Sequence, residues 1–189
     1  MTQARSKAFY TDYGIADSPT GRFDMLTVHM ILVLIRLQAE AEKSREISQL
    51  LSETFVRDMD HSLREMGIGD LSVAKRVRRM NNALLGQLRL YATLIDEAEA
   101  EPLAAALERN INTVETTEPS DASHPDQAMK LSRYMRMGHK RIAEQAYDNI
   151  IAGEIAFPDP LDPNLNHPAS NSAEIKNTEI GDNIHDGTH

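Results

Sequence analysis

The chain has no cysteine and no tryptophan among its 189 residues, and only 5% of its residues are aromatic. The absence of cysteine excludes disulfide bonds, thiolate metal sites and a cysteine nucleophile, and it fits a reducing compartment. The longest apolar run, residues 25–37, is shorter than the ~20 residues that span a bilayer, and Thr27, His29 and Arg36 interrupt it. The first ten residues lack the apolar stretch of a secretion signal. We therefore expect neither a transmembrane helix nor secretion.

Charge is unevenly distributed along an acidic chain whose net charge is −9. Residues 158–189 contain six acidic residues and one lysine, so they account for −5 of the total. This stretch is rich in Pro, Asn, Asp, Ser and Gly, and it cannot bury enough apolar surface to offset the entropy of ordering. We therefore predict one globular domain over residues 1–157 and a disordered acidic tail over residues 158–189.

Apolar residues recur at helical spacing and no strand alternation with hairpin glycines is present, so the predicted fold class is all-α. The expected single bundle of about six helices covers residues 22–42, 44–66, 71–98, 102–112 and 126–144, with a short last helix before Gly153. The first helix is apolar on nearly every side and should be central. Ser44 is the expected N-cap of the second helix. Residues 113–125 should form a polar connection.

Residues 66–70 (MGIGD) form a turn between two of the expected helices. Gly67 and Gly69 can adopt positive φ just past one helix, and Asp70 can accept N–H hydrogen bonds at the start of the next. We interpret these three residues as a structural corner that determines how two long helices cross.

Residues 71–95 contain no acidic residue, although the protein as a whole is acidic. Their five basic residues form what we call the basic strip: Lys75, Arg76, Arg78, Arg79 and Arg89. Four of them point away from the apolar stripe of the expected helix, and Arg76 lies on its flank. Two interpretations are open. The strip is a solvated face whose exposed ion pairs contribute ~0–1 kcal/mol each, or it recognises an anionic surface of RNA, lipid or protein.

Signals for catalysis or metal binding are weak. Asp58, His61 and Glu65 have the spacing that places ligands on one helical face, but such groups are common on solvated faces. A calcium loop starting at Asp58 is excluded because leucine and glycine occupy its sixth and twelfth positions. His29 lies in the most apolar stretch and is expected to be hydrogen-bonded in the core. No nucleophile elbow, zinc-protease motif or Walker lysine occurs. We predict no catalytic residue, no metal and no cofactor.

Two groups of apolar side chains have two interpretations each. The nine methionines either fill gaps in the core or line a soft groove that accepts varied apolar helices; among those on apolar faces are Met59, Met66 and Met80. The aromatic residues near the start should fold back as a lid, which either caps the core or lines a binding site. They are Phe9, Tyr10, Tyr13 and Phe23.

Residues 58–80, in which DMD, LREMG and GDL precede a basic run ending in methionine, resemble the ubiquinol–cytochrome c chaperone family, the assembly factors of respiratory complex III. The resemblance includes residues 8–26 (AFYTDYGIADSPTGRFDML) and continues through the YATLIDEA and LAAALERNI segments. It ends at the Gly-x-hydrophobic-x-Phe-Pro segment of residues 153–158. Most of residues 8–158 is thus covered.

The resemblance implies a non-enzymatic chaperone that binds newly made cytochrome b for building the ubiquinol–cytochrome c reductase. Its implied partners are nascent cytochrome b, a ribosome or an anionic membrane surface, and a small partner protein as in eukaryotic members. Because the chain has no long mitochondrial presequence, we expect a bacterial member in the cytoplasm, peripheral at the inner membrane. The residues we expect to face the client are Tyr10, Tyr13, Phe23 and His29, with the basic strip as a further binding surface.

The competing class is a nucleic-acid-binding module in which residues 57–80 form a helix-turn-helix and the cations of the basic strip contact phosphates. The overall acidity argues against this class, and so do the residues that would open the recognition helix. Leu71, Ser72 and Val73 offer few side chains that can read bases. We therefore expect no DNA partner.

Overall fold

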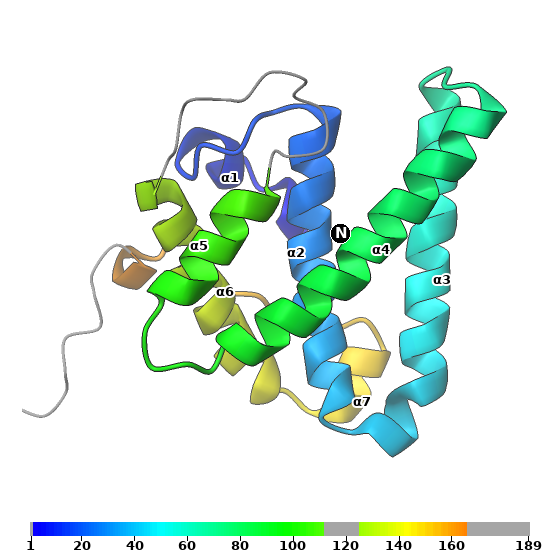
Figure 1. Ribbon diagram of the computed structural model, residues 1–189. Coiled ribbons are helices and arrows are strands. Elements are labelled where there is room, and N and C mark those ends of the chain that lie inside the picture. Colours follow the sequence, from blue (N-terminus) through cyan, green and yellow to red (C-terminus); the bar gives the residue numbers. More distant parts are fainter. Residues whose placement is uncertain (1, 112–124, 166–189) are drawn as a thin grey trace, which may run out of the picture.

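The computed structural model describes residues 2–111 and 125–165, and all regular structure in these ranges is helical (Figure 1). The longer helices are α2 (Pro19–Gln38), α3 (Ala41–Glu65), α4 (Asp70–Leu94), α5 (Glu101–Asn110) and α6 (Pro125–Ala143). Shorter elements are α1 (Ala8–Thr11), α7 (Tyr147–Ile151) and the 3₁₀ turns η1 (Gln3–Arg5) and η2 (Pro163–Leu165). The all-α prediction is confirmed, whereas α1, η1 and η2 were not predicted. None of the described helices is long and apolar enough to cross a membrane.

Helix α2 lies at the centre of the bundle, as its apolar sequence predicts. It contacts α6 on one side and α3 and α4 on the other (Figure 1). The helix begins at Pro19, earlier than predicted, because the Ser18 hydroxyl accepts a hydrogen bond from the Gly21 amide at 3.2 Å and proline fits the first turn. Met25 and Ile31 of α2 are completely buried. The core therefore surrounds α2.

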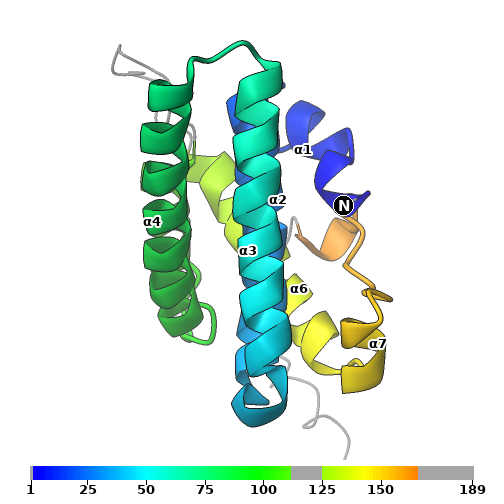
Figure 2. The same ribbon diagram turned by 90° about the vertical axis from the view of Figure 1, so that its right-hand side faces the viewer.

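Helices α3 and α4 form a long antiparallel hairpin whose turn lies at an outer corner of the molecule (Figures 1 and 2). The sequence predicts an apolar stripe on α4, and its members lie toward the core: five are buried, Val73, Leu84, Leu88, Tyr91 and Ile95, and two are half-buried, Val77 and Met80. Their spacing of three and four residues turns one face of α4 toward the core.

The predicted N-cap of α3 was wrong. This helix begins at Ala41 with Glu40 at the N-cap position, and Ser44 lies inside the first turns. Ser44 is buried, and its hydroxyl donates a hydrogen bond to the Tyr147 hydroxyl of α7 at 3.3 Å. A partner from the other end of the chain therefore accounts for this serine, and such a partner is invisible to local capping rules.

The C-terminal part of the described chain belongs to the folded body. Residues 158–165 were assigned to the tail, yet Pro158, Pro160 and Leu165 are buried. Backbone carbonyls of this segment bind the N-terminal segment: Pro160 accepts from the Tyr13 hydroxyl at 2.8 Å, and Pro158 accepts from Gln3 Nε2 at 2.8 Å. The folded body thus continues past the predicted boundary at residue 157. The rest of the predicted tail and most of the predicted polar connection lie outside the described residues.

An aromatic cluster joins the N-terminal segment and the segment around Phe157 to α2 and α6. The Phe9 ring lies 5.0 Å from Tyr134 of α6, and the His29 ring of α2 lies 4.9 Å from Phe157, centroid to centroid. His29 Nδ1 donates to the Met25 carbonyl at 2.7 Å, and Nε2 accepts from the Tyr134 hydroxyl at 2.8 Å. Because a carbonyl can only accept, Nδ1 carries a proton, and because burial lowers the pKa of His29 to about 4, the ring is neutral at pH 7 and Nε2 is the acceptor. The prediction of a hydrogen-bonded core histidine is confirmed.

Burial of His29 makes the stability of the fold dependent on pH. Burial lowers the pKa of His29 to about 4, whereas an unfolded chain has a histidine pKa of ~6.5. Between these values the unfolded state binds a proton that the folded state does not, so the free energy of unfolding falls as the pH falls. We expect protonation of His29 in the unfolded state to lower the free energy of unfolding by about 2 kcal/mol between pH 7 and pH 5. Urea denaturation at the two pH values measures this change.

The variants that test this are His29→Gln and His61→Gln. Glutamine at position 29 cannot take up a proton, so we expect lower stability at pH 7 but a much flatter dependence between pH 7 and pH 5. His61 is exposed, and His61→Gln should keep the wild-type dependence. Equal slopes for the wild type and His29→Gln would contradict a buried neutral imidazole.

Candidate functional site: a groove between the N-terminal segment and the hairpin

A groove of about 1120 Å³ separates the N-terminal segment and the start of α2 from the adjoining halves of α3 and α4. Its volume exceeds the ~300–1000 Å³ typical of pockets for small molecules. Four segments form its walls, and they are far apart in the sequence: residues 4–10, 17–26, 58–66 and 76–80. The size and shape suit a stretch of polypeptide better than a small ligand.

The lining of the groove is largely apolar and rich in methionine. Each wall contributes large side chains: Tyr10, Phe23, Leu26, Met59, Leu63, Met66 and Met80. Phe23 is anchored against Phe55 of α3, with 5.7 Å between ring centroids. Both interpretations of the methionines apply, because Met25 and Met135 are buried in the core while three others line the groove. Flexible methionine side chains allow such a surface to fit apolar partners of different shapes.

The charged residues that line the groove are mostly basic. Five are cationic, Arg5, Lys7, Arg22, Arg76 and Arg79, and three are acidic, Asp17, Asp58 and Glu65. Two of the acids have basic partners in the lining: Arg22 Nε lies 2.8 Å from Asp17 Oδ1, and His61 Nε2 lies 3.2 Å from Glu65 Oε1. The hydrogen bond from Arg22 lowers the pKa of the Asp17 carboxyl. The lining therefore has more cations than anions, although the protein as a whole is acidic, and such a field favours negatively charged groups.

The N-terminal aromatic residues divide between core and groove. Phe9 and Tyr13 are completely buried, and so is most of His29. Tyr10 and Phe23 are half-buried and line the groove. The Tyr10 hydroxyl donates to the Ala4 carbonyl at 3.1 Å, which holds its ring in the groove wall. Of the four residues expected to face a client, only Tyr10 and Phe23 are accessible in this structure.

The basic strip does not form a single surface. Arg76 and Arg79 line the groove, whereas Lys75, Arg78 and Arg89 are exposed on the outer side of α4. Two cations of the strip thus belong to the groove lining, and three are presented to the solvent.

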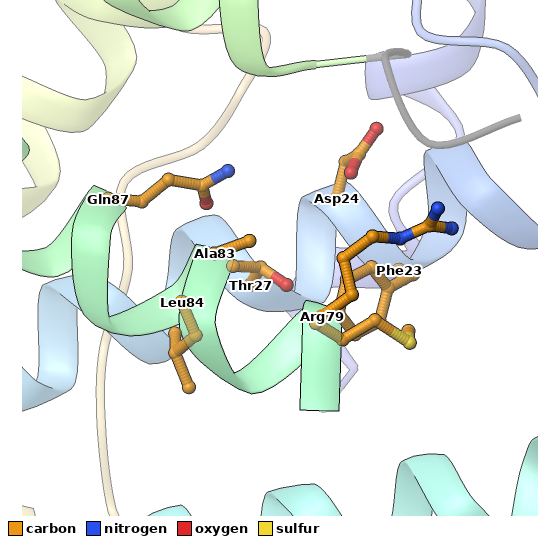
Figure 3. A pocket seen from close by; sticks show the side chains of 8 residues that line it. Phe23, Asp24, Thr27, Arg79, Ala83, Leu84 and Gln87 are labelled. Atoms are coloured by element: carbon orange, nitrogen blue, oxygen red, sulfur yellow. The ribbon is translucent and has the colours of Figure 1, made fainter. Parts of the chain in front are cut away.

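A smaller cavity of about 190 Å³ lies between α2 and α4 and shares Phe23, Arg79 and Met80 with the groove. Figure 3 shows Arg79 extending from α4 toward α2, on which Phe23, Asp24 and Thr27 lie. Asp24 and Thr27 are both buried, and the Thr27 hydroxyl has no hydrogen-bond partner among the described residues. Neither residue was predicted from the sequence to belong to a site. Two polar residues three positions apart on an apolar helix were the available signal.

The corner between α3 and α4 differs in part from its prediction. Gly67 has φ +76°, as expected for a glycine past a helix end, but Gly69 has φ −65° and ψ 145°. Gly69, not Asp70, is the N-cap of α4, and no side chain caps that end. The predicted capping by Asp70 was wrong because its carboxylate pairs with Arg64, which also binds Asp60 at 2.6 Å.

The hairpin geometry argues against the competing helix-turn-helix. That motif joins two helices at ≈ 90–120°. Here residues 57–80 are the end of an antiparallel hairpin whose two helices have 25 residues each; α4 leaves the turn close to α3 and diverges from it toward its far end, without lying perpendicular to it (Figures 1 and 2). In the described ranges, no three or more histidine or acidic residues form a group that can hold a metal ion.

Two comparisons with known proteins give the same result. A family model described as "Ubiquinol-cytochrome C chaperone" matches residues 11–157. The crystal structure of the Cbp3 homolog from Brucella abortus matches with a TM-score of 0.71 and 33% sequence identity, over 84% of this chain and 84% of that one. Among curated proteins, no sequence matches the chain.

The two corner glycines should respond oppositely to the same substitution. Gly67→Ser places an L-residue at positive φ, so we expect the free energy of unfolding to fall by about 1–2 kcal/mol. Gly69→Ser leaves the backbone unstrained and supplies a side-chain cap, so we expect a gain of about 0.5 kcal/mol. No atom within 4 Å would meet a Cβ at either position, so crowding does not enter. Urea denaturation of both variants measures the difference; equal effects would contradict the assigned backbone geometry.

Proposed function

The chain belongs to the ubiquinol-cytochrome C chaperone family, and on this basis we propose that it is a non-enzymatic assembly chaperone of respiratory complex III. Its client is newly made cytochrome b, and it holds this client in the groove between the N-terminal segment and the α3–α4 hairpin. The observation that carries this proposal is the groove itself, which combines an apolar, methionine-rich lining with a surplus of basic residues.

The lining suits a client that is apolar and variable along its length. Successive segments of a membrane protein present different apolar side chains, and a rigid pocket would fit only one of them. Met59, Met66 and Met80 can change rotamer at low cost, so one groove accepts several segments in turn. Exposed and half-buried residues make up much of this lining. A shallow site of this kind releases its client without nucleotide hydrolysis.

The charge of the groove supports fast capture. Arg5, Lys7 and Arg79 surround the apolar lining, and their field increases the rate at which acidic segments next to apolar ones encounter it. Apolar contact then determines how long the segment stays bound.

The proposed place of work is the bacterial cytoplasm, peripheral at the inner membrane, where cytochrome b is inserted as it is made. A ribosome and a small partner protein are further proposed contacts. No described feature favours the competing nucleic-acid-binding class, because the hairpin lacks helix-turn-helix geometry and Arg76 and Arg79 line the groove.

The test is affinity capture of cytochrome b from cells that express tagged variants. Met59→Glu and Met80→Glu each place a carboxylate in the apolar lining, so we expect captured cytochrome b to fall about tenfold or more, because contact with an unpaired charge costs more than ~1.4 kcal/mol. The matched control is Met137→Glu. This methionine is half-buried on α6 and does not line the groove.

Two results would contradict the proposal. One is equal loss of cytochrome b with the groove variants and the control, at similar thermal stability of all three. The other is normal assembly of the ubiquinol–cytochrome c reductase in cells that lack the gene, measured by cytochrome b difference spectra and native gels.

A further inference from the structure

The tip of the α3–α4 hairpin, residues 64–72, exposes apolar side chains at an outer corner of the molecule (Figures 1 and 2). Every residue of this tip is exposed except Ile68, which is half-buried. Leu71 is 89% exposed and Met66 is 52% exposed, and Leu71 is the most exposed large apolar residue in the described ranges. A single exposed leucine needs no explanation. Leu71 differs because it lies at the end of a projecting hairpin next to a second apolar side chain, Met66, which is half exposed although it also lines the groove.

Cations follow the exposed leucine along the same face of α4. Leu71, Lys75 and Arg78 have i, i+4 and i+7 spacing, so they lie in one row, and all three are exposed. The row continues with Leu85 and Arg89, which are also exposed. The acidic groups nearest the tip have basic partners: Asp70 pairs with Arg64, and Glu65 lies 3.2 Å from His61. The outer face of α4 therefore carries Leu71 at its end and the cations Lys75 and Arg78 behind it, while Arg64 is shared between Asp60 and Asp70.

We propose that this tip binds the surface of an anionic lipid bilayer. In this arrangement Leu71 enters the boundary between headgroups and acyl chains, and Lys75 and Arg78 contact lipid phosphates. Long basic side chains reach headgroups while neighbouring apolar groups lie deeper. Anionic lipids attract basic residues that lie close to the membrane.

The apolar end of the tip favours a bilayer over RNA. Recognition of unpaired RNA uses aromatic side chains on which bases stack, and no Phe, Tyr or Trp occurs from residue 56 to residue 90. Aliphatic side chains such as Leu71 contribute little to an RNA contact, whereas they contribute directly to membrane binding. The proposal does not depend on the client of the groove.

The absence of tryptophan from the chain allows a direct test. Leu71→Trp places a unique fluorophore at the tip, and we expect its emission to shift to the blue with vesicles of phosphatidylcholine and phosphatidylglycerol, but not with phosphatidylcholine alone. The matched control is Leu50→Trp, at an exposed position of α3 away from the tip. Its emission should not change.

Vesicle co-sedimentation with the purified full chain measures the contributions of charge and apolar contact. We expect Leu71→Ser to weaken binding about tenfold and the double variant Lys75→Glu, Arg78→Glu to weaken it about tenfold or more. Arg89→Glu is the control for charge, because Arg89 lies on the same face but about 21 Å from Lys75 along the helix. It should change binding less than about twofold, since salt screens beyond ~10 Å.

Three results would overturn the proposal: equal binding to neutral and anionic vesicles, an unshifted emission of the Leu71→Trp variant when it is bound to vesicles, or binding to RNA without binding to vesicles. Because these measurements contain no client, they can fail while cytochrome b is still captured, and the reverse also holds.

Discussion

The buried, neutral imidazole of His29 is the constraint on which much of the architecture depends. It accepts from Tyr134, and Tyr134 in turn accepts from Gln3 Nε2 at 3.2 Å, so one chain of hydrogen bonds links α2, α6 and the N-terminus. Gln3 also donates to the Pro158 carbonyl, which brings in the C-terminal segment. A polar group this deep in an aromatic cluster is tolerated only when its partners are in place. The N-terminal segment and the segment around Pro158 are therefore held against α2 and α6.

This arrangement determines one wall of the groove. Tyr10 follows directly after Phe9, whose ring packs against His29 and Tyr134 with centroids 5.4 Å and 5.0 Å apart. Because Phe9 is fixed in the core, Tyr10 is fixed at the surface, on the side that faces the hairpin. The opposite wall belongs to α3 and α4, whose long apolar stripes pack on each other and on α2. The groove is thus the space between a wall anchored by the aromatic cluster and a wall formed by the hairpin.

How far the sequence predicts this structure depends on the distance over which each feature is determined. The prediction that the stripe from Val73 to Ile95 faces the core is correct because helical periodicity alone decides which residues share a face. Local capping rules failed for Ser44 and Asp70 because each residue has a side-chain partner elsewhere, Tyr147 and Arg64. The groove combines four separate segments. Methionine composition and N-terminal aromatic residues indicated some of its members, but nothing local distinguishes Arg5 or Leu26 from ordinary surface and core residues.

The basic strip divides between two faces of α4. Lys75 and Arg78 are three residues apart, as are Arg76 and Arg79, so each pair lies on one face of α4. The two pairs are offset by one residue, which is a rotation of about 100° around the helix axis. That rotation turns Arg76 and Arg79 into the groove and leaves Lys75 and Arg78 outside it. The run of cations that looks like a single motif in the sequence therefore divides between the groove lining and the outer face of α4. A protein that holds a client on one side of α4 can contact a second, anionic surface with the other, because the two sets of charges do not compete for the same partner.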